Sequence, residues 1–283
     1  MKTDGFTKHT EDKYIKKLGD GSIGAIQLYK KQDGTYYTIK KMRRTKENAY
    51  MFEDDKTIVN YIHNEYTVGT ILNNHPFIRQ TLGINYIYNE LYLEYLAGID
   101  FFDYIFDMKD NEDKLDHYFH FYKQCIEGLS YMHDKGIAHM DIKLENLILD
   151  IPSRTLKIID LGVARFFKKD QYFIDHIGMY GTTAYMSPEQ FTQRYNPEKV
   201  DVWSCGILFY ELVYFSTPWE IARKKDKDYY DYYYFFTTYD KLLPRLFNQS
   251  KYNELFYKTL HPNPNHRCTM SHILILLEEI IHN

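Results

Sequence analysis

Four polar side chains whose chemistry suits phosphoryl transfer lie close together in the middle of the sequence. Asp141, Lys143 and Asn146 share one short stretch, and Asp160 follows after an apolar run. Transfer of a phosphoryl group to a hydroxyl needs a carboxylate that orients the acceptor, a cation near the moving phosphate and oxygen ligands for Mg²⁺. Because these four residues supply all of those groups, the sequence predicts a catalytic site that uses Mg²⁺.

A glycine-rich stretch near the N-terminus predicts a site for phosphate groups. Gly19, Gly21 and Gly24 match the pattern G-x-G-x-x-G, in which the absent side chains let backbone N–H groups approach phosphate oxygens. A dinucleotide-binding fold would place a helix directly after the glycines. Residues 25–29 alternate like a strand instead, and a second strand follows a turn at 33–34. The pattern therefore favours a β-hairpin that covers the phosphates of a nucleotide.

Lys40 lies near the end of this second strand, 16 residues after Gly24. A lysine there can bind nucleotide phosphates if a buried carboxylate fixes it. Glu65, on the only helix expected in this part of the chain, is the preferred partner, and Glu53 is the alternative. We expect Lys40 and Glu65 to form an ion pair.

Hydrophobic periodicity predicts a strand-rich first third and a helix-rich remainder. Alternating or β-rich runs predict strands at 25–29, 36–42 and 86–95 around one helix at 57–72. Apolar residues spaced as on one helix face predict later helices at 119–136, 200–214 and 271–281. We expect two lobes joined near Glu94 to Gly98, with the ligand site between them.

Composition excludes several other classes of protein. The 283 residues are 44% hydrophobic and 26% charged, as in a globular protein, and 35 basic against 39 acidic residues give a net charge of −4, which does not favour a nucleic-acid partner. No window is apolar enough for membrane insertion, and the start lacks the apolar core of a signal peptide. The three cysteines are far apart, which fits a reducing compartment. We expect a cytoplasmic protein, with entry into the nucleus left open.

Two further motifs follow the catalytic stretch in a fixed order. Gly181-Thr182-Thr183-Ala184-Tyr185-Met186-Ser187-Pro188-Glu189 has the form that closes a kinase activation segment, and Asp201-Val202-Trp203-Ser204-Cys205-Gly206 opens a helix. With the glycine loop, these motifs make the chain resemble the eukaryotic protein kinases over about residues 14 to 282. The resemblance implies an α+β, two-lobed kinase-like fold: a small antiparallel β lobe with one main helix (14–96) and a larger, mainly helical lobe (97–283), after a polar tail (1–13).

The resemblance also implies roles for individual residues. Asp141 would be the catalytic base, Lys143 would contact the γ-phosphate of ATP, and Asn146 with Asp160 would hold Mg²⁺. Leu93 would be the gatekeeper, Glu94 and Leu96 would offer backbone contacts to adenine, and Ile148 would form its floor. Asp201 would support the catalytic loop, and Glu189 would pair with Arg267. The residues assigned to the nucleotide are Leu18, Gly19, Gly21, Gly24, Ile26, Lys40, Glu65, Leu93, Glu94, Leu96, Asp100, Ile148 and Asp160.

The substrate class follows from two of these motifs. The lysine at 143 and the Gly181-Thr182 pair before Tyr185 resemble serine/threonine kinases, so the expected acceptors are Ser and Thr hydroxyls of protein substrates. Within that class the chain looks most like the fungal halotolerance and permease-regulating kinases. The dual-specificity kinases that activate MAP kinases are the alternative.

One residue departs from the family pattern. The usual His-Arg-Asp is here His139-Met140-Asp141, and a thioether cannot make the charge-assisted bond by which that arginine grips an activating phosphate. We expect activity that does not depend strongly on phosphorylation between Asp160 and Glu189. Arg165 could still offer a weaker contact.

Three carboxylates suggest a preference for basic substrates. Asp100, Glu145 and Glu211 occupy positions that line the peptide groove in kinases that prefer arginines just before the acceptor, and together they focus a negative field. The alternative is a ribose contact for Asp100 and surface or packing roles for the other two.

The rival function is a pseudokinase, a scaffold that keeps the fold without transferring phosphate. Met140, Thr38 and an extra residue before His75 favour this alternative. The complete set of Lys40, Asp141, Lys143, Asn146 and Asp160 argues against it, because a scaffold has no need of the full catalytic and Mg²⁺-binding set.

Overall fold

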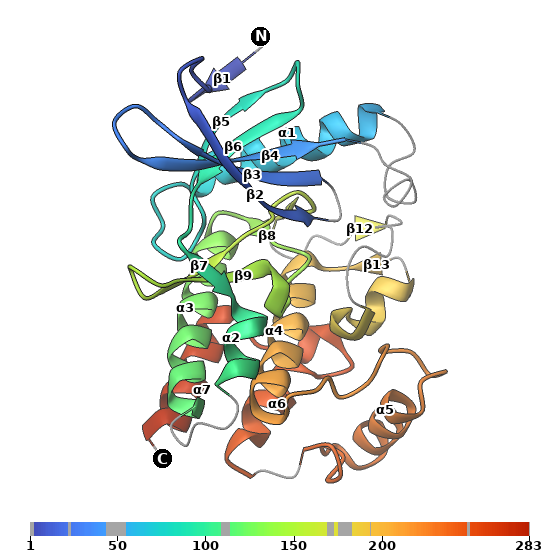
Figure 1. Cartoon of the computed structure of the whole chain (residues 1–283). Coiled ribbons are helices and arrows are strands. Elements are labelled where there is room, and N and C mark those ends of the chain that lie inside the picture. The colour runs from blue at the N-terminus through green and yellow to red at the C-terminus, as the bar shows by residue number, and fades with distance from the viewer. Residues whose placement is uncertain are drawn as a thin grey trace.

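A computed structural model describes residues 3–21, 24–43, 55–108, 114–168, 173–174, 183–192, 194–247 and 250–282. Figure 1 shows a small, strand-rich lobe that carries the N-terminus above a larger, mainly helical lobe that carries the C-terminus. The small lobe ends with strand β6 (Glu90–Glu94), and the large lobe begins with strand β7 (Gly98–Asp100). The predicted α+β, two-lobed fold and its joint near Glu94 to Gly98 are therefore confirmed.

The small lobe is a six-stranded antiparallel sheet in the order β1-β5-β6-β4-β3-β2. Besides β6, its strands are β1 (Thr3–Gly5), β2 (Lys13–Gly21), β3 (Gly24–Lys30), β4 (Tyr36–Met42) and β5 (Thr81–Asn85). The strands predicted at 25–29 and 36–42 are β3 and β4, which pair as a hairpin; β2, which was not predicted, forms a second hairpin with β3 around the glycines. The dinucleotide-binding alternative is excluded, because a strand and not a helix follows Gly24.

Helix α1 (Asp55–Leu72) packs on one face of this sheet. Ile58 and Ile62 of this helix are buried against Leu91 and Leu93 of β6. Residues 91 and 93 are two positions apart on the strand, so their side chains point to the same face of the sheet. Thr38 and Lys40 lie on that same face of β4, since their neighbours Tyr37 and Ile39 pack on the opposite face. This alternation presents Lys40 to α1 and to the junction of the lobes.

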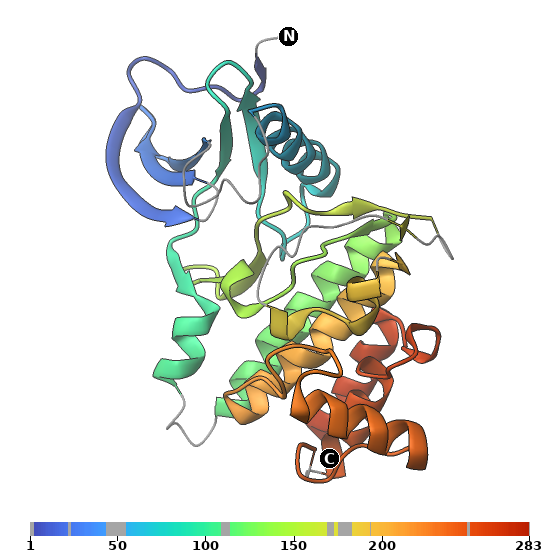
Figure 2. The same cartoon turned by 90° about the vertical axis from the view of Figure 1, so that its right-hand side faces the viewer.

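The large lobe is built around two long helices that cross its core (Figure 2). Its helices are α2 (Phe101–Asp107), α3 (Lys114–Asp134), α4 (Pro197–Tyr214), α5 (Lys227–Tyr239), α6 (Asn253–Thr259) and α7 (Met270–His282). Helix α3 buries Phe119, Tyr122, Ile126 and Leu129, the face predicted from their spacing. Asn196 caps helix α4 by accepting from the N–H of Glu198, 3.0 Å away.

Short strands line the top of the large lobe, where it meets the small one (Figure 1). β7 pairs with β9 (Leu147–Asp150), which pairs in turn with β10 (Thr155–Ile158). β8 (Ile137–Ala138) pairs with β11 (Arg165–Phe166), and β12 (Phe173–Ile174) pairs with β13 (Arg194–Tyr195). These pairings fix the ends of the loops that carry the candidate catalytic residues.

Two predictions about the small lobe need correction. The strand predicted at 86–95 is wrong in its first half, because residues 86–89 form a turn and only Glu90–Glu94 are extended. Strand β5 was not predicted. Part of the polar tail also belongs to the sheet: β1 pairs with β5, and the Phe6 ring packs 4.9 Å from the Tyr37 ring. In the described part of the chain, no helix has both the length and the apolar character needed to cross a membrane.

Candidate active site

The β9–β10 hairpin brings Asn146 and Asp160 together. Leu147 pairs with Ile158, so the residues just outside the hairpin, Asn146 and Ile159, face one another. The N–H of Ile159 donates to the backbone oxygen of Asn146 over 3.0 Å. Asp160 follows with a left-handed φ of 63°, a conformation that non-glycine residues rarely adopt. Two oxygen-bearing side chains therefore stand at one end of the hairpin.

Asp141 lies in the loop that leads into this hairpin and has two partners. Lys143 Nζ lies 2.8 Å from Asp141 Oδ2, and Asn146 Nδ2 donates to the same oxygen over 2.9 Å. Burial raises the pKa of Asp141 above its ordinary value, and the Lys143 ammonium opposes this rise. The stretch from Asp141 to Asn146 thus forms one connected polar group.

Asp201, in the first turns of helix α4, supports the catalytic loop from below. Its fully buried carboxylate accepts from the N–H groups of His139 and Met140, each over 2.8 Å. His133 of α3 lies 2.8 Å from the same carboxylate. These contacts hold Met140 at a left-handed φ of 72°, and its side chain is buried beside Tyr195. The predicted support of the loop by Asp201 is confirmed.

Lys40 joins the small lobe to this group. Its ammonium lies 2.8 Å from Glu65 Oε2 and 3.0 Å from Asp160 Oδ1, so the predicted pair with Glu65 is confirmed. Burial alone would lower the pKa of Lys40, but the Asp160 and Glu65 carboxylates outweigh burial and raise it. Burial would raise the pKa of Asp160, yet Lys40 and Tyr61 lower it to about 2. Glu53, the alternative partner, lies outside the described residues.

Sequence reasoning missed two residues of helix α1 that hold the loop around Asp160. The Tyr61 hydroxyl donates to Asp160 Oδ1 over 2.8 Å. Asn64 Nδ2 donates to the backbone oxygens of Gly162 and Ala164, each over 3.0 Å. A side chain at residue 162 would collide with the Tyr61 ring, because an added Cβ would lie 1.8 Å from it. Tyr61 lies four positions before Glu65 and so on the same helix face, but this spacing does not reveal that its hydroxyl reaches Asp160.

The residues assigned to the base of the nucleotide lie on the two sides of the joint. Leu93 and Leu96 are buried at the joint. Ile148 on β9 pairs with Asp100 on β7, at the top of the large lobe. On the small-lobe side of the joint, the β2–β3 hairpin carries five more residues assigned to the nucleotide: Leu18, Gly19, Gly21, Gly24 and Ile26.

Register ties this hairpin to the strand of Lys40. Ile26 pairs with Lys40, and Gly24 pairs with Met42, across β3 and β4. Gly24 has no room for a side chain, since a Cβ there would lie 1.9 Å from the backbone oxygen of Lys41. The glycine at this position thus permits a close strand approach. The positions of Ser22 and Ile23 at the tip lie outside the described residues.

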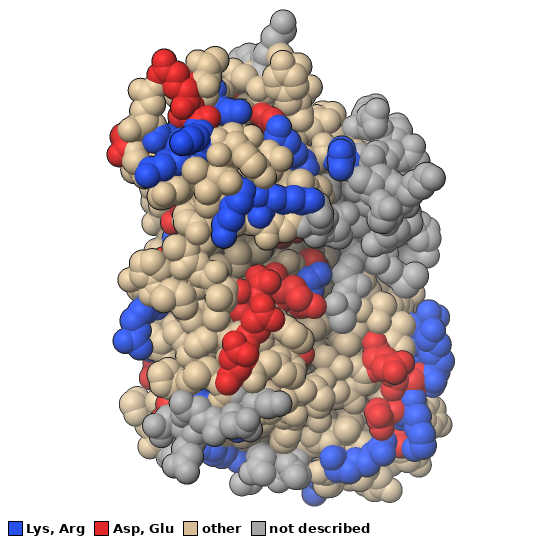
Figure 3. Space-filling model, viewed as in Figure 1, with Lys and Arg blue, Asp and Glu red and all other residues tan. Residues whose placement is uncertain are grey.

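Acidic side chains gather on the large lobe directly below the small lobe (Figure 3). Asp103 and Glu145 are close enough to Asp100 to raise its pKa, together with burial, which is the larger cause. Glu145 also contributes to the raised pKa of Glu211, for which burial is again the main cause. The Glu211 carboxylate accepts a bond from the Tyr185 hydroxyl. Asp100, Asp103 and Glu145 are exposed and form one acidic patch, whereas Glu211 is buried.

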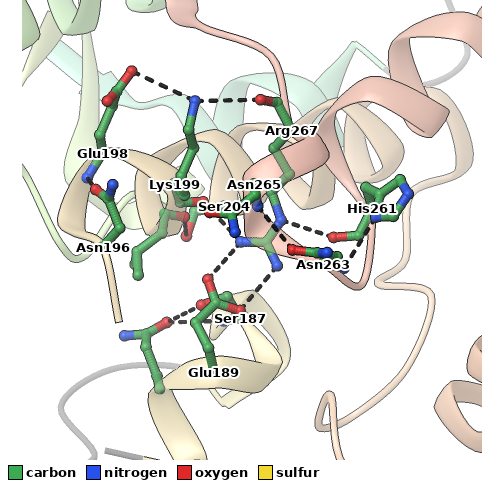
Figure 4. A network of polar contacts seen from close by, with 12 residues as sticks. Ser187, Glu189, Asn196, Glu198, Lys199, Ser204, His261, Asn263, Asn265 and Arg267 are labelled. Atoms are coloured by element: carbon green, nitrogen blue, oxygen red, sulfur yellow. Dashed lines mark hydrogen bonds and ion pairs between the residues drawn. The ribbon is translucent and has the colours of Figure 1, made fainter. Parts of the chain in front are cut away.

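The end of the activation segment is anchored to the large lobe by a buried ion pair (Figure 4). Arg267 Nη1 and Nη2 lie 2.6 and 2.9 Å from the two oxygens of Glu189, in a bidentate contact. The same guanidinium donates to the backbone oxygens of His261 and Lys199, each over 2.9 Å. It also stacks 4.7 Å from the centre of the Trp203 ring. The predicted pairing of Glu189 with Arg267 is confirmed.

Two stretches of this segment, 169–172 and 175–182, lie outside the described residues. Tyr172, Tyr180 and Thr182 lie outside the described residues. Thr183 is described, and its hydroxyl donates to the backbone oxygen of Glu220 over 2.9 Å.

Comparison with known proteins shows one matching domain family and several similar fungal proteins. A model of the protein kinase domain matches residues 13–276. The chain is similar to serine/threonine-protein kinase hal4 of Schizosaccharomyces pombe, with 29% identity over 275 residues, which are 91% of this chain and 41% of that protein. It is 32% identical to serine/threonine-protein kinase chk1 of the same yeast over 235 residues, covering 81% of this chain and 45% of that protein.

A third relative has a name linked to transport. The nitrogen permease reactivator protein of Saccharomyces cerevisiae is 30% identical over 224 residues, which are 77% of this chain and 27% of that protein. The predicted likeness to fungal serine/threonine kinases, including one named for a permease, is confirmed. The chain matches less than half the length of each of these three relatives.

Proposed function

This chain belongs to the protein kinase family, and on that premise we propose that it transfers the γ-phosphate of ATP to Ser and Thr hydroxyls of protein substrates with the help of Mg²⁺. The observation that carries the proposal is the convergence of residues from three segments on one point. Lys40 contacts Asp160, Ile159 bonds to Asn146, and Asn146 with Lys143 contacts Asp141. Phosphoryl transfer relies mainly on such positioning and on electrostatic stabilisation.

In this proposal Lys40 binds phosphate oxygens of the nucleotide. The carboxylate of Glu65 fixes the ammonium group at 2.8 Å, and the raised pKa of Lys40 keeps it charged at neutral pH. The glycine hairpin, whose β3 strand pairs with the strand of Lys40, covers the same phosphates. Adenine would lie at the joint, against Leu93 and Ile148, with backbone contacts to Glu94 and Leu96.

Asp141 is proposed to orient the acceptor hydroxyl and to take its proton. Lys143 lies 2.8 Å from the Asp141 carboxylate, where it can also reach the transferred phosphate. Its charge stabilises the negative charge that develops on the equatorial oxygens.

Asn146 and Asp160 are proposed to hold Mg²⁺, and the donor set fits this ion. Mg²⁺ prefers oxygen ligands, often one or two carboxylates together with phosphate oxygens. Asn146 donates through Nδ2 to Asp141, which leaves its amide oxygen to serve as a ligand. The pKa of Asp160, lowered to about 2, keeps its carboxylate ionised at neutral pH. Bound Mg²⁺ would neutralise charge on the phosphates.

The proposal is tested by incubating the protein with Mg²⁺ and γ-labelled ATP and a protein acceptor, followed by phosphoamino-acid analysis. Label on Ser and Thr is the expected result. Label on Tyr as well would support the dual-specificity alternative. Nucleotide binding without any transfer would support the pseudokinase alternative.

We further propose that the protein is located in the cytoplasm, and this proposal leaves entry into the nucleus open. The three cysteines, Cys125, Cys205 and Cys268, are buried and unpaired, as is usual in a reducing compartment.

We predict that activity does not require phosphorylation of the activation segment. Met140 is buried and offers no cation to a phosphate, while Tyr61 and Asn64 already fix the loop around Asp160 without one. Phosphatase treatment should therefore change the specific activity less than about threefold, since at most the weaker contact of Arg165 is lost. Comparison of treated and untreated protein measures this effect.

Single replacements identify any site that contradicts this prediction. Tyr172→Phe, Tyr180→Phe and Thr183→Ala are compared before and after phosphatase treatment. A many-fold activation that depends on phosphate at any one of these sites would show that the expectation is wrong. Thr182 is judged separately, because its family role is to bond Asp141 and Lys143, so its replacement should damage catalysis regardless of phosphorylation.

We predict a preference for basic residues just before the acceptor. The exposed patch of Asp100, Asp103 and Glu145 attracts cations, although exposed charge pairs contribute only about 0.2–1 kcal/mol each. Glu145→Gln should therefore lower the selectivity for arginine, measured as kcat/KM in a positional peptide library, by about two- to fivefold. Glu254→Gln, on the exposed surface of helix α6, is the matched control and should leave selectivity unchanged. A library with no basic preference would leave the patch with only ribose-binding or surface roles.

A further inference from the structure

A pair of polar residues, Thr38 and Arg79, lies at the inner side of the joint, and neither appears in the function proposed above. Thr38 pairs with Leu93 in the register of β4 and β6. Its hydroxyl lies 3.4 Å from the backbone oxygen of Leu93 and 3.5 Å from that of Glu94. Arg79 Nη2 donates to the Thr38 hydroxyl, and Arg79 Nε donates to the backbone oxygen of Glu94 over 3.0 Å. The guanidinium is thus bound directly to the joint.

The position of Arg79 is fixed from the large lobe. Its N–H donates to the backbone oxygen of Ile158 on β10 over 3.0 Å, next to the hairpin that carries Asn146 and Asp160. Its side chain retains some exposure. Thr38 precedes Lys40 by two residues on the same strand face. Arg79 therefore lies between the joint and the phosphate-binding end of the site.

The guanidinium keeps its positive charge in this position. Burial lowers the pKa of Arg79 to about 10, while the carboxylates of Glu65, Glu94 and Asp160 oppose that fall. At neutral pH the group remains protonated. A permanent cation with five N–H donors, two of them used by Thr38 and Glu94, therefore stands beside the backbone oxygen proposed to bind the base.

We propose that Arg79 is a specificity-determining residue that allows this site to bind guanine nucleotides as well as adenine nucleotides. The inference rests on the proposed function, because it assumes that the base lies against the backbone of Glu94 and Leu96. Guanine presents two acceptors, O6 and N7, on one edge, and an arginine can bind both with its parallel N–H groups. Adenine presents N7 beside an amino group, which would donate to the backbone oxygen of Glu94. That oxygen already accepts from Arg79 Nε.

Discrimination by this contact should be measurable. A bidentate pair between arginine and guanine changes base selectivity by about one order of magnitude. Sites built to hydrogen-bond a substrate group lose affinity when that group or its partner is removed. Arg79→Met keeps an unbranched apolar chain but removes every donor, so it should weaken binding of guanine nucleotides more than binding of ATP.

The test is calorimetric titration of the whole chain with the Mg²⁺ complexes of ATP, GTP and inosine triphosphate. Inosine carries O6 and N7 but lacks the 2-amino group, so it isolates the edge that Arg79 would read. Wild-type protein should bind GTP and inosine triphosphate with Kd values within about tenfold of the Kd for ATP. In Arg79→Met the ratio of the Kd for either 6-oxopurine to the Kd for ATP should rise by about fivefold or more.

A matched control replaces an arginine far from the site. Arg245→Met removes the guanidinium that pairs with Asp228 and Asp231 on the surface, and it should leave all three Kd values unchanged. If the ratio of the Kd for a 6-oxopurine nucleotide to the Kd for ATP rose less than about fivefold in Arg79→Met, the inference would be overturned. The proposed kinase function would remain intact. If Arg79→Met does not fold, wild-type binding decides: 6-oxopurine nucleotides that bind more than about tenfold more weakly than ATP overturn the inference. Failure of all three nucleotides to bind would overturn the proposed function as well.

Discussion

Replacing Asp141 by Asn is expected to lower kcat for phosphoryl transfer about a thousandfold, because the variant loses the carboxylate that takes the hydroxyl proton. Lys143 and Asn146 both donate to Asp141 Oδ2, and an amide oxygen can accept the same two bonds. We therefore expect the loop, the fold and nucleotide binding to be retained. Transfer of labelled γ-phosphate at saturating MgATP measures kcat, and calorimetry measures Kd for the nucleotide.

The separation of kcat from Kd makes this prediction specific. A residue that acts only in the transition state changes kcat and leaves ground-state binding unaltered. Asp107→Asn, at the exposed end of helix α2, makes the same chemical change outside the site and should behave as wild type. If Asp141→Asn kept more than about a tenth of the wild-type kcat, Asp141 would not be the catalytic base.

Much of the candidate site could be predicted because its residues stand in short, ordered motifs. Asp141, Lys143 and Asn146 are neighbours in sequence, so their convergence needs only one loop. Asp160 follows a strand pair whose apolar runs are visible in the sequence, and antiparallel pairing then places it beside Asn146. Glu65 could be preferred over Glu53 because it lies within the helix predicted at 57–72, and the resemblance supports the same choice.

The residues that were missed depend on contacts between distant parts of the chain. Tyr61 reaches Asp160, and Arg79 reaches Thr38, through side chains whose directions no local pattern specifies. Arginine is mostly a surface residue and tyrosine is intermediate in burial, so neither residue type gave a signal.

The strand error in the small lobe has a local cause. The β-rich run at 86–95 contains Asn89, which adopts a left-handed φ of 51° and closes the turn between β5 and β6. Asparagine tolerates this conformation better than most residues, so it was the available turn signal within an otherwise β-rich run. The strand before the turn, β5, begins with Thr81-Leu82-Gly83, and its central glycine weakened the strand pattern.

The largest expected effect on stability comes from Arg267, which pairs with Glu189. Arg267→Met should lower the free energy of unfolding by about 3–5 kcal/mol, because it leaves the Glu189 carboxylate buried without its partner. The backbone oxygens of His261 and Lys199 lose their donor at the same time. Urea denaturation followed by fluorescence measures the change.

A second variant separates loss of the charge pair from loss of packing. Glu189→Met combined with Arg267→Met removes both charges, so no carboxylate is left without a partner, and the double variant should regain part of the lost stability. Arg245→Met serves as the exposed control, because its pairs with Asp228 and Asp231 are exposed to solvent and should contribute little to stability. If Arg267→Met and Arg245→Met lowered the free energy of unfolding equally, the buried Glu189–Arg267 pair would contribute no more to stability than an exposed pair. The end of the activation segment would then depend on packing around Trp203 instead, since Arg267 stacks on that ring.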